Sequence, residues 1–217
     1  YFKFHLLAGF PGLVHGVLTR LGGSSPAPFD SLNLSGKEAD APENVAANRA
    51  LAAAALGLSR PIFFASQVHG STVVSLKNDE TEAEALKTAS ITGDGLLTDI
   101  PGLPIAIQLA DCQAILLYDP VRRVVGSIHA GWRGSVENIA AAAIRRMEKD
   151  FGSAPADIRA AVSPSLGPCC GEFKNYRKEL PQAFWSYRDS RDCFDFWAIT
   201  RDQLQAAGVL PEHMTSA

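Results

Sequence analysis

One stretch of this chain decides its fold: Val124-Val125-Gly126-Ser127-Ile128-His129-Ala130-Gly131-Trp132-Arg133-Gly134-Ser135-Val136-Glu137-Asn138-Ile139. It begins as a β-branched run, passes through a turn with two glycines, a histidine and an arginine, and continues into an alanine-rich segment with helical spacing. In α/β folds such a turn lies beyond the carboxyl end of a strand, where backbone amides bind ligands and anions. We therefore expect His129 and Arg133 to share one small pocket.

A β-hairpin is predicted directly before this turn. The apolar run Ala114–Tyr118 is followed by Asp119-Pro120, which turns the chain back into a second strand over Val121–Ile128. Asp111 and Cys112 interrupt the apolar pattern just ahead of the hairpin. The hairpin should therefore bring both residues close to the His129 turn.

The remaining pattern predicts helices and strands in alternation. After the turn, apolar residues fall on one helical face as far as Phe151, and Gly152 is a typical helix stop. Further helices are expected over 42–56 and 173–184 and from a capping box at Thr200 to Gly208, and strands over Val14–Thr19, Pro61–Ala65, Thr72–Leu76 and Ile158–Val162. The acidic segment Asn78–Ser90 is expected to be a solvated helix or loop. This alternation is typical of an α/β protein.

Length and composition favour one globular domain. The chain has 217 residues, 47% of them hydrophobic, and 20 Lys and Arg stand against 23 Asp and Glu. No stretch gathers the basic residues that nucleic acid requires, so a nucleic-acid partner is not expected. The apolar runs are shorter than the roughly 18 residues that span a bilayer, and no signal pattern opens the sequence. We expect a cytoplasmic monomer without a membrane partner.

The four cysteines do not form a regular disulfide framework. They are Cys112, Cys169, Cys170 and Cys193, and two of them are adjacent. Secreted disulfide-rich domains have more cysteines at regular spacings. Free thiols are therefore expected.

Three residues at strand ends could bind a metal ion. His69, Cys112 and His129 are soft or borderline ligands that lie far apart in the sequence. Three ligands from separate strand ends suit a catalytic zinc, whose fourth position stays open. The same residue types also allow a nucleophilic Cys112 activated by His129, or purely structural roles. Residue types alone leave these alternatives open.

Seven short motifs follow one another along the chain. They are Thr19–Gly23, Ser31–Leu34, Gln67–Gly70, Asp94–Asp99, Ala110–Cys112, His129–Gly134 and Pro164–Cys170. In this order they resemble the signature of the YfiH-like family, also called the laccase-domain, polyphenol oxidase or purine nucleoside phosphorylase family, and the resemblance covers about residues 10 to 210. Family members usually continue beyond the position of Met214, so residues 1–217 are expected to form one YfiH-like domain that lacks the family's C-terminal segment.

The resemblance implies a zinc site and a fold. It makes His69, Cys112 and His129 the zinc ligands, with copper as a possible substitute that binds nitrogen and sulfur ligands tightly. It also implies a single-domain α/β/β/α sandwich similar to the catalytic domain of cytotoxic necrotizing factor.

The activities that the resemblance implies concern purine nucleosides. They are phosphorolysis of adenosine, inosine and methylthioadenosine, with a purine nucleoside and phosphate as substrates, and deamination of adenosine. The alternatives are a Cys-His hydrolase acting on a peptidoglycan precursor, a copper-dependent polyphenol oxidase (laccase), and a non-catalytic partner-binding domain. Multicopper oxidation needs many histidines, whereas this chain has five.

Five further residues are candidates for substrate contacts. Asp111 is expected to orient a ligand or to accept a proton from the purine, with a structural role next to the metal ligands as the alternative. Arg133 is expected to bind phosphate or stabilise a leaving group, unless it pairs with Glu137. Arg20 and Asn33 lie near a long loop and could reach the nucleoside, although Asn33 could equally satisfy a turn. Cys169 is a candidate for the pocket lining, with burial as a small apolar residue as the alternative.

Overall fold

The computed structural model describes residues 1–36, 39–77 and 91–217. The predicted segment Asn78–Ser90 lies outside the described residues. Six strands form the main sheet in the order β2-β3-β6-β5-β7-β8. They are β2 (Val73–Leu76), β3 (Gly95–Thr98), β6 (Val124–Ala130), β5 (Gln113–Asp119), β7 (Arg159–Val162) and β8 (Met214–Ser216).

The sheet is mixed. β2 and β3 are parallel, as are β7 and β8, whereas β6 is antiparallel to β3 and β5, and β5 to β7. The predicted hairpin is confirmed as β5 and β6, but its second strand begins at Val124, because residues 120–123 form the turn and Arg123 has a φ of 57°. The hairpin forms the two central strands of the sheet, and the flanking strands β3 and β7 pair with it.

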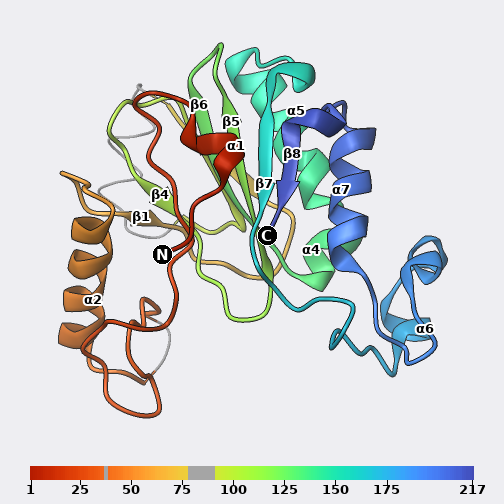
Figure 1. Ribbon diagram of the computed structural model, residues 1–217, viewed down its shortest axis with the longest axis horizontal. Coiled ribbons are helices and arrows are strands. Elements are labelled where there is room, and N and C mark those ends of the chain that lie inside the picture. Colours follow the sequence, from red (N-terminus) through yellow and green to blue (C-terminus); the bar gives the residue numbers. More distant parts are fainter. Residues whose placement is uncertain (37–38, 78–90) are drawn as a thin grey trace.

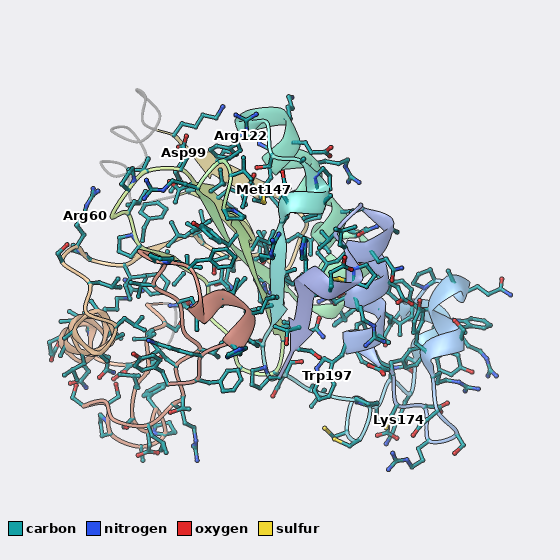
Figure 2. All side chains as sticks on the ribbon, turned by 45° about the horizontal axis from the view of Figure 1, so that its top comes forward. Arg60, Asp99, Arg122, Met147, Lys174 and Trp197 are labelled. Atoms are coloured by element: carbon teal, nitrogen blue, oxygen red, sulfur yellow. The ribbon has the colours of Figure 1, made fainter. Side chains whose placement is uncertain are left out.

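Helices α5 (Ile139–Phe151) and α7 (Phe196–Ala206) cover one face of the sheet (Figure 1). Ile115, Leu117 and Ile128 project from β5 and β6 onto this face and pack with Ile144 and Met147 of α5. Met147 is fully buried and labelled in Figure 2. Burying such side chains contributes about 1.5 to 3 kcal/mol each, so this is the main core.

The other face of the sheet packs against smaller elements. α1 (His5–Ala8) supplies Leu7, which clusters with Phe4 and Tyr118. A two-stranded parallel sheet of β1 (Phe63–Phe64) and β4 (Ile105–Ala106) packs against Leu96 of β3. α2 (Pro42–Ala55) lies outside these strands (Figure 1). The predicted mixed α/β class is confirmed, whereas the likeness to cytotoxic necrotizing factor stays a prediction.

The predicted helix after the His129 turn is divided into two. α4 (Trp132–Val136) ends before Asn138, whose φ of 59° is left-handed and whose side chain accepts a hydrogen bond from the Ala141 amide. Asparagine tolerates this conformation, so it closes one helix and caps the next. Gly152 ends α5 as predicted.

Two other helix predictions were partly wrong. Within 173–184 only α6 (Tyr176–Glu179) is α-helical, and a 3₁₀ helix (Gln182–Tyr187) follows Pro181, which cannot continue an α-helix. The last helix begins at Phe196 rather than at Thr200, because Asp195 caps it. Thr200 is buried and donates a hydrogen bond to Gln113 instead of capping.

The strand predicted over Val14–Thr19 was also wrong, since only Val17 forms an isolated bridge, with Phe2.

Short 3₁₀ helices cover Pro155–Asp157 and Pro211–His213. Among the described helices, none combines the length and the apolar character needed to cross a bilayer.

Candidate metal centre

The structure brings His69, Cys112 and His129 together. Their ligand atoms all lie within 4.8 Å of one another. Zinc bonds to nitrogen and sulfur are about 2.0 to 2.3 Å long, so side chains this close need only small rotations to share one ion. His129 is buried, Cys112 is half-buried and His69 is exposed, so the group opens to solvent on the His69 side.

Strand register explains how two of these residues meet. His129 lies in β6 on the face opposite α5, because the neighbouring Ile128 and Ala130 point into the core beneath that helix. β5 pairs Gln113 with Ala130, so Cys112, one residue earlier, lies opposite Gly131. His69 arrives from the loop after β1 with a φ of 62°. Its ring lies edge-on to that of His129, with 4.8 Å between the centroids.

Asp94 holds His129 and the His69 loop in place through hydrogen bonds. The register that pairs Gly95 with Ile128 places Asp94 opposite His129. One carboxylate oxygen accepts hydrogen bonds from His129 Nδ1 at 2.8 Å and from the His69 amide at 2.9 Å. The other oxygen accepts from the amides of Val68 and Gly70. The bond to Nδ1 leaves His129 Nε2 as the ligand atom, as in other carboxylate–histidine–metal arrangements.

Burial and hydrogen bonding set the protonation states of Asp94 and His129. Burial alone would raise the pKa of Asp94, but the hydrogen bonds from His129 and the three amides outweigh it and lower the pKa. Burial lowers the pKa of His129 despite the nearby Asp94 carboxylate. His129 is therefore a neutral imidazole at neutral pH, which is the form that binds metal.

The environment of Cys112 argues against an independent nucleophile. Burial, together with the negative charges of Asp111 and Asp94, raises the pKa of the Cys112 thiol. Reactive cysteines usually have a lowered pKa and a positively charged neighbour. The same negative surroundings favour a bound cation, which would convert the thiol to a thiolate.

Gly131 leaves the space in which an ion would sit. A Cβ atom at this position would lie 3.2 Å from the Cys112 sulfur, 3.3 Å from His69 Cδ2 and 3.7 Å from His129 Cε1. No other residue type leaves this gap open. Two imidazoles and a thiolate around it are a donor set typical of zinc, so the residues fit the metal that the sequence predicts.

Substitution of Gly131 by Ala is expected to weaken zinc binding about tenfold or more, because overpacking typically costs 1 to 3 kcal/mol. Competition with a chromophoric chelator measures this affinity. Gly9→Ala is the matched control, since Gly9 has a φ of −79° and nothing within 4 Å of the added Cβ. Equal affinities of the two variants would show that Gly131 does not border the ion.

Zinc binding at neutral pH is expected to release a proton from Cys112. The raised pKa keeps the thiol protonated, so affinity should rise about tenfold per pH unit until the pH passes that pKa. Calorimetry in buffers of different ionisation enthalpy measures the released proton. Cys193→Ser should retain this pH dependence, whereas Cys112→Ser should bind no zinc and release no proton. A pH-independent affinity in the unsubstituted protein would contradict the assignment.

Asp111 directly precedes the ligand Cys112, whereas Arg133 follows His129 by four residues, on α4. Asp111 is exposed, and its carbonyl oxygen accepts a hydrogen bond from the Leu166 amide. Arg133 is exposed on α4 and stacks over the Trp132 ring at 4.3 Å. Within the described part of the chain no carboxylate, including that of Glu137, forms an ion pair with Arg133. Its guanidinium is therefore available to an anion.

Arg20, Asn33 and Cys169 are not among the residues that the structure groups at the metal centre, and each has other partners. Arg20 is exposed, and its carbonyl oxygen accepts from the Ser31 and Leu32 amides. The Asn33 amide donates to Asp40, and its oxygen accepts from the Ser35 amide. Cys169 is exposed and contacts Cys170, so the predicted alternative of burial is wrong. Roles in substrate binding stay predictions for all three.

Sequence reasoning missed the role of Asp94 and a glutamine pair. The Gln67 side chain donates a hydrogen bond to the Gln108 backbone carbonyl and accepts one from the Gln108 backbone amide. The Gln108 side chain donates in turn to the Leu34 carbonyl. This links the His69 loop to the N-terminal loop. The available signal for Asp94 was its position between Gly93 and Gly95, directly before a buried strand.

A groove of about 790 Å³ runs along α2, away from the three ligands. Its lining includes Asp40, Arg49 and four alanines of α2 and includes none of the ligands. We place the candidate site at the ligands, because they supply the chemistry.

Comparison with known proteins supports the sequence resemblance. A family model described as multi-copper polyphenol oxidoreductase laccase matches residues 14–217. A purine nucleoside phosphorylase of Deinococcus radiodurans is 37% identical over 204 residues, which cover 90% of this chain and 75% of the relative. Purine nucleoside phosphorylase YlmD of Geobacillus stearothermophilus is 34% identical over 218 residues, which cover 94% of this chain and 79% of the relative.

Two solved structures share the fold. The hypothetical protein YfiH of Bacillus licheniformis matches with a TM-score of 0.81 and 30% identity, over 91% of this chain and 79% of that protein. YlmD of Geobacillus stearothermophilus matches with a TM-score of 0.78 and 30% identity, over 91% of this chain and 78% of that protein.

Proposed function

This chain belongs to the YfiH-like family of laccase-domain proteins, and from that membership we propose that it is a zinc-dependent purine nucleoside phosphorylase that also deaminates adenosine. One observation carries the metal part of the proposal: His69, Cys112 and His129 converge with their ligand atoms within 4.8 Å and with one side open. The names of the relatives support a purine nucleoside as the small-molecule substrate. Adenosine, inosine and methylthioadenosine are the proposed substrates.

The three ligands would hold the ion while the surrounding residues act on the substrate. When bound, zinc supplies positive charge and Lewis acidity on the open side of the site. Arg133, stacked on Trp132, would bind phosphate through its planar guanidinium, which matches two phosphate oxygens. Asp111 would orient the purine or accept its proton. Asp94 would keep the His129 ring and the His69 loop in place.

Phosphorolysis and deamination place different demands on this site. Phosphorolysis needs phosphate held against the anomeric carbon while the glycosidic bond breaks, which is the role proposed for Arg133. Deamination needs water directed at C6 of adenine, as in other zinc deaminases. The exposed side of the centre is open to either reactant, so we propose both activities at one site.

Product analysis tests this function. Zinc-loaded protein with adenosine and phosphate should give adenine and ribose 1-phosphate, and without phosphate it should give inosine. A chelator should abolish both reactions, and added zinc should restore them. If neither adenine nor inosine forms, the proposal is wrong.

The same experiment separates the alternatives. A hydrolase that uses Cys112 would resist the chelator and lose activity with a thiol alkylator. A polyphenol oxidase would need copper and would consume dioxygen with a phenol. Three histidines lie outside the centre: His5 begins α1, His15 accepts a hydrogen bond from the Phe4 amide, and His213 contacts Arg159. This arrangement favours a single-ion site over a multicopper one.

A further inference from the structure

Two cysteines outside the metal centre form a pair of neighbouring thiols. Cys169 and Cys170 are both exposed, and their sulfur atoms lie 3.2 Å apart. This distance corresponds to a hydrogen bond between the thiol groups. From this geometry we propose that Cys169 and Cys170 are a modification site, at which a peroxide forms a reversible disulfide between them.

The backbone around the pair holds both side chains on one turn. The amides of Cys170 and Gly171 donate to the Gly167 carbonyl at 3.1 and 2.8 Å. A Cβ at Gly167 would lie 2.9 Å from the ring of Trp197, which Figure 2 labels, so the turn packs closely on the start of α7. Because the turn is anchored at Gly167, the two sulfurs stay adjacent and remain accessible to a small oxidant.

The chemistry requires only a peroxide. One of the two sulfurs attacks a peroxide oxygen, the O–O bond breaks, and water and a sulfenic acid are produced. The other sulfur then attacks the sulfenic sulfur, forms the S–S bond and displaces a second water. The two thiols lose two electrons and two protons, and the peroxide is reduced to two waters.

The geometry of the pair makes both thiols equivalent candidates for the first step. Either sulfur can donate the hydrogen bond between the thiols, and the Cys170 thiol also donates to the Gly167 carbonyl at 3.8 Å. Whichever sulfur reacts first with the peroxide, the other lies within reach to resolve the sulfenic acid. The other two cysteines are placed differently, because Cys193 is buried and Cys112 belongs to the metal centre.

The disulfide is expected to be easily reduced. Adjacent Cα atoms are about 3.8 Å apart, below the roughly 4.4 to 6.8 Å usual for a disulfide, so the bond forms under strain. Strained, exposed disulfides have the higher reduction potentials of regulatory rather than structural bonds. A dithiol reductant should restore both thiols.

Alkylation and peptide mass mapping of the zinc-loaded protein test this proposal. After hydrogen peroxide, the peptide with Cys169 and Cys170 should lose the mass of two hydrogen atoms and both alkylation sites, and a dithiol should restore them. Cys193→Ser should behave identically, whereas Cys169→Ser should stop at the sulfenic acid of Cys170.

Three results would overturn the proposal. They are two thiols that still alkylate after peroxide treatment, oxygen added to the pair without an S–S bond, and a disulfide that maps to Cys193 or to a second chain. Phenylarsine oxide, which bridges neighbouring thiols, gives an independent measurement on the reduced protein. One equivalent should block both alkylation sites, and failure to block them would contradict the pairing.

Discussion

Substitution of His129 by Ala is expected to remove the bound metal and, with it, both purine reactions. His129 supplies the most deeply buried ligand atom, and its imidazole has no substitute at that position. Changes to groups that only support a ligand typically cost 10- to 100-fold in metal affinity, so the loss of a ligand should exceed about 100-fold. Metal analysis after dialysis and product formation from adenosine measure the two effects.

Two further variants make this result specific. His213→Ala is the matched control, because His213 contacts Arg159 and the Ala156 carbonyl outside the centre. It should retain a full equivalent of zinc. Cys112→Ser changes one atom of a half-buried side chain and should lose the metal while keeping the fold. If His129→Ala folds and still retains zinc at the original affinity, the proposed centre is wrong.

Substitution of Asp94 by Asn should weaken both folding and metal binding. The carboxylate is fully buried and accepts four hydrogen bonds, from His129 Nδ1 and from the amides of Val68, His69 and Gly70. An asparagine replaces one acceptor oxygen by a donor that faces N–H groups. Removal of one partner from a buried charged network typically costs about 3 to 5 kcal/mol. Zinc affinity should fall about 10- to 100-fold.

The contribution of Asp94 to the free energy of unfolding should depend on pH in one direction. The folded state lowers the pKa of Asp94, so its stabilisation is present above the ordinary carboxyl pKa and is lost as the pH falls through the lowered value. Denaturant unfolding of the metal-free protein across the acid range measures this. Asp94→Asn should flatten that part of the stability profile.

Asp40→Asn is the matched control for Asp94→Asn. Asp40 also accepts several hydrogen bonds, from Ser25, Asn33, Asn44 and the Ala41 amide, but none of these groups belongs to the centre. Its substitution should lower stability without changing zinc affinity. An equal loss of zinc affinity in the two variants would show that Asp94 acts only through general stability.

Local patterns predicted the central hairpin, the helix over Pro42–Ala55 and the end of α5 well. The apolar run of β5, the return strand β6 and the glycine that ends α5 are encoded within short windows of sequence. The segment 173–184 was harder, because Tyr176, Phe194 and Phe196 form a separate aromatic cluster. Pro181 interrupts the α-helix, and contacts with Phe194 and Phe196 determine how the segment packs.

The sequence by itself determined the α/β class, the hairpin and the motifs that place His69, Cys112 and His129 at strand ends. The family resemblance added the prediction that these three side chains share one ion, whereas only the tertiary structure decided how they meet, that Gly131 leaves room among them and that Asp94 supports them. The physical reason is that spacing in sequence reports local periodicity, whereas cross-strand register joins Gly95 to Ile128 and Gln113 to Ala130. The centre depends on that register, which forms only when the whole sheet assembles.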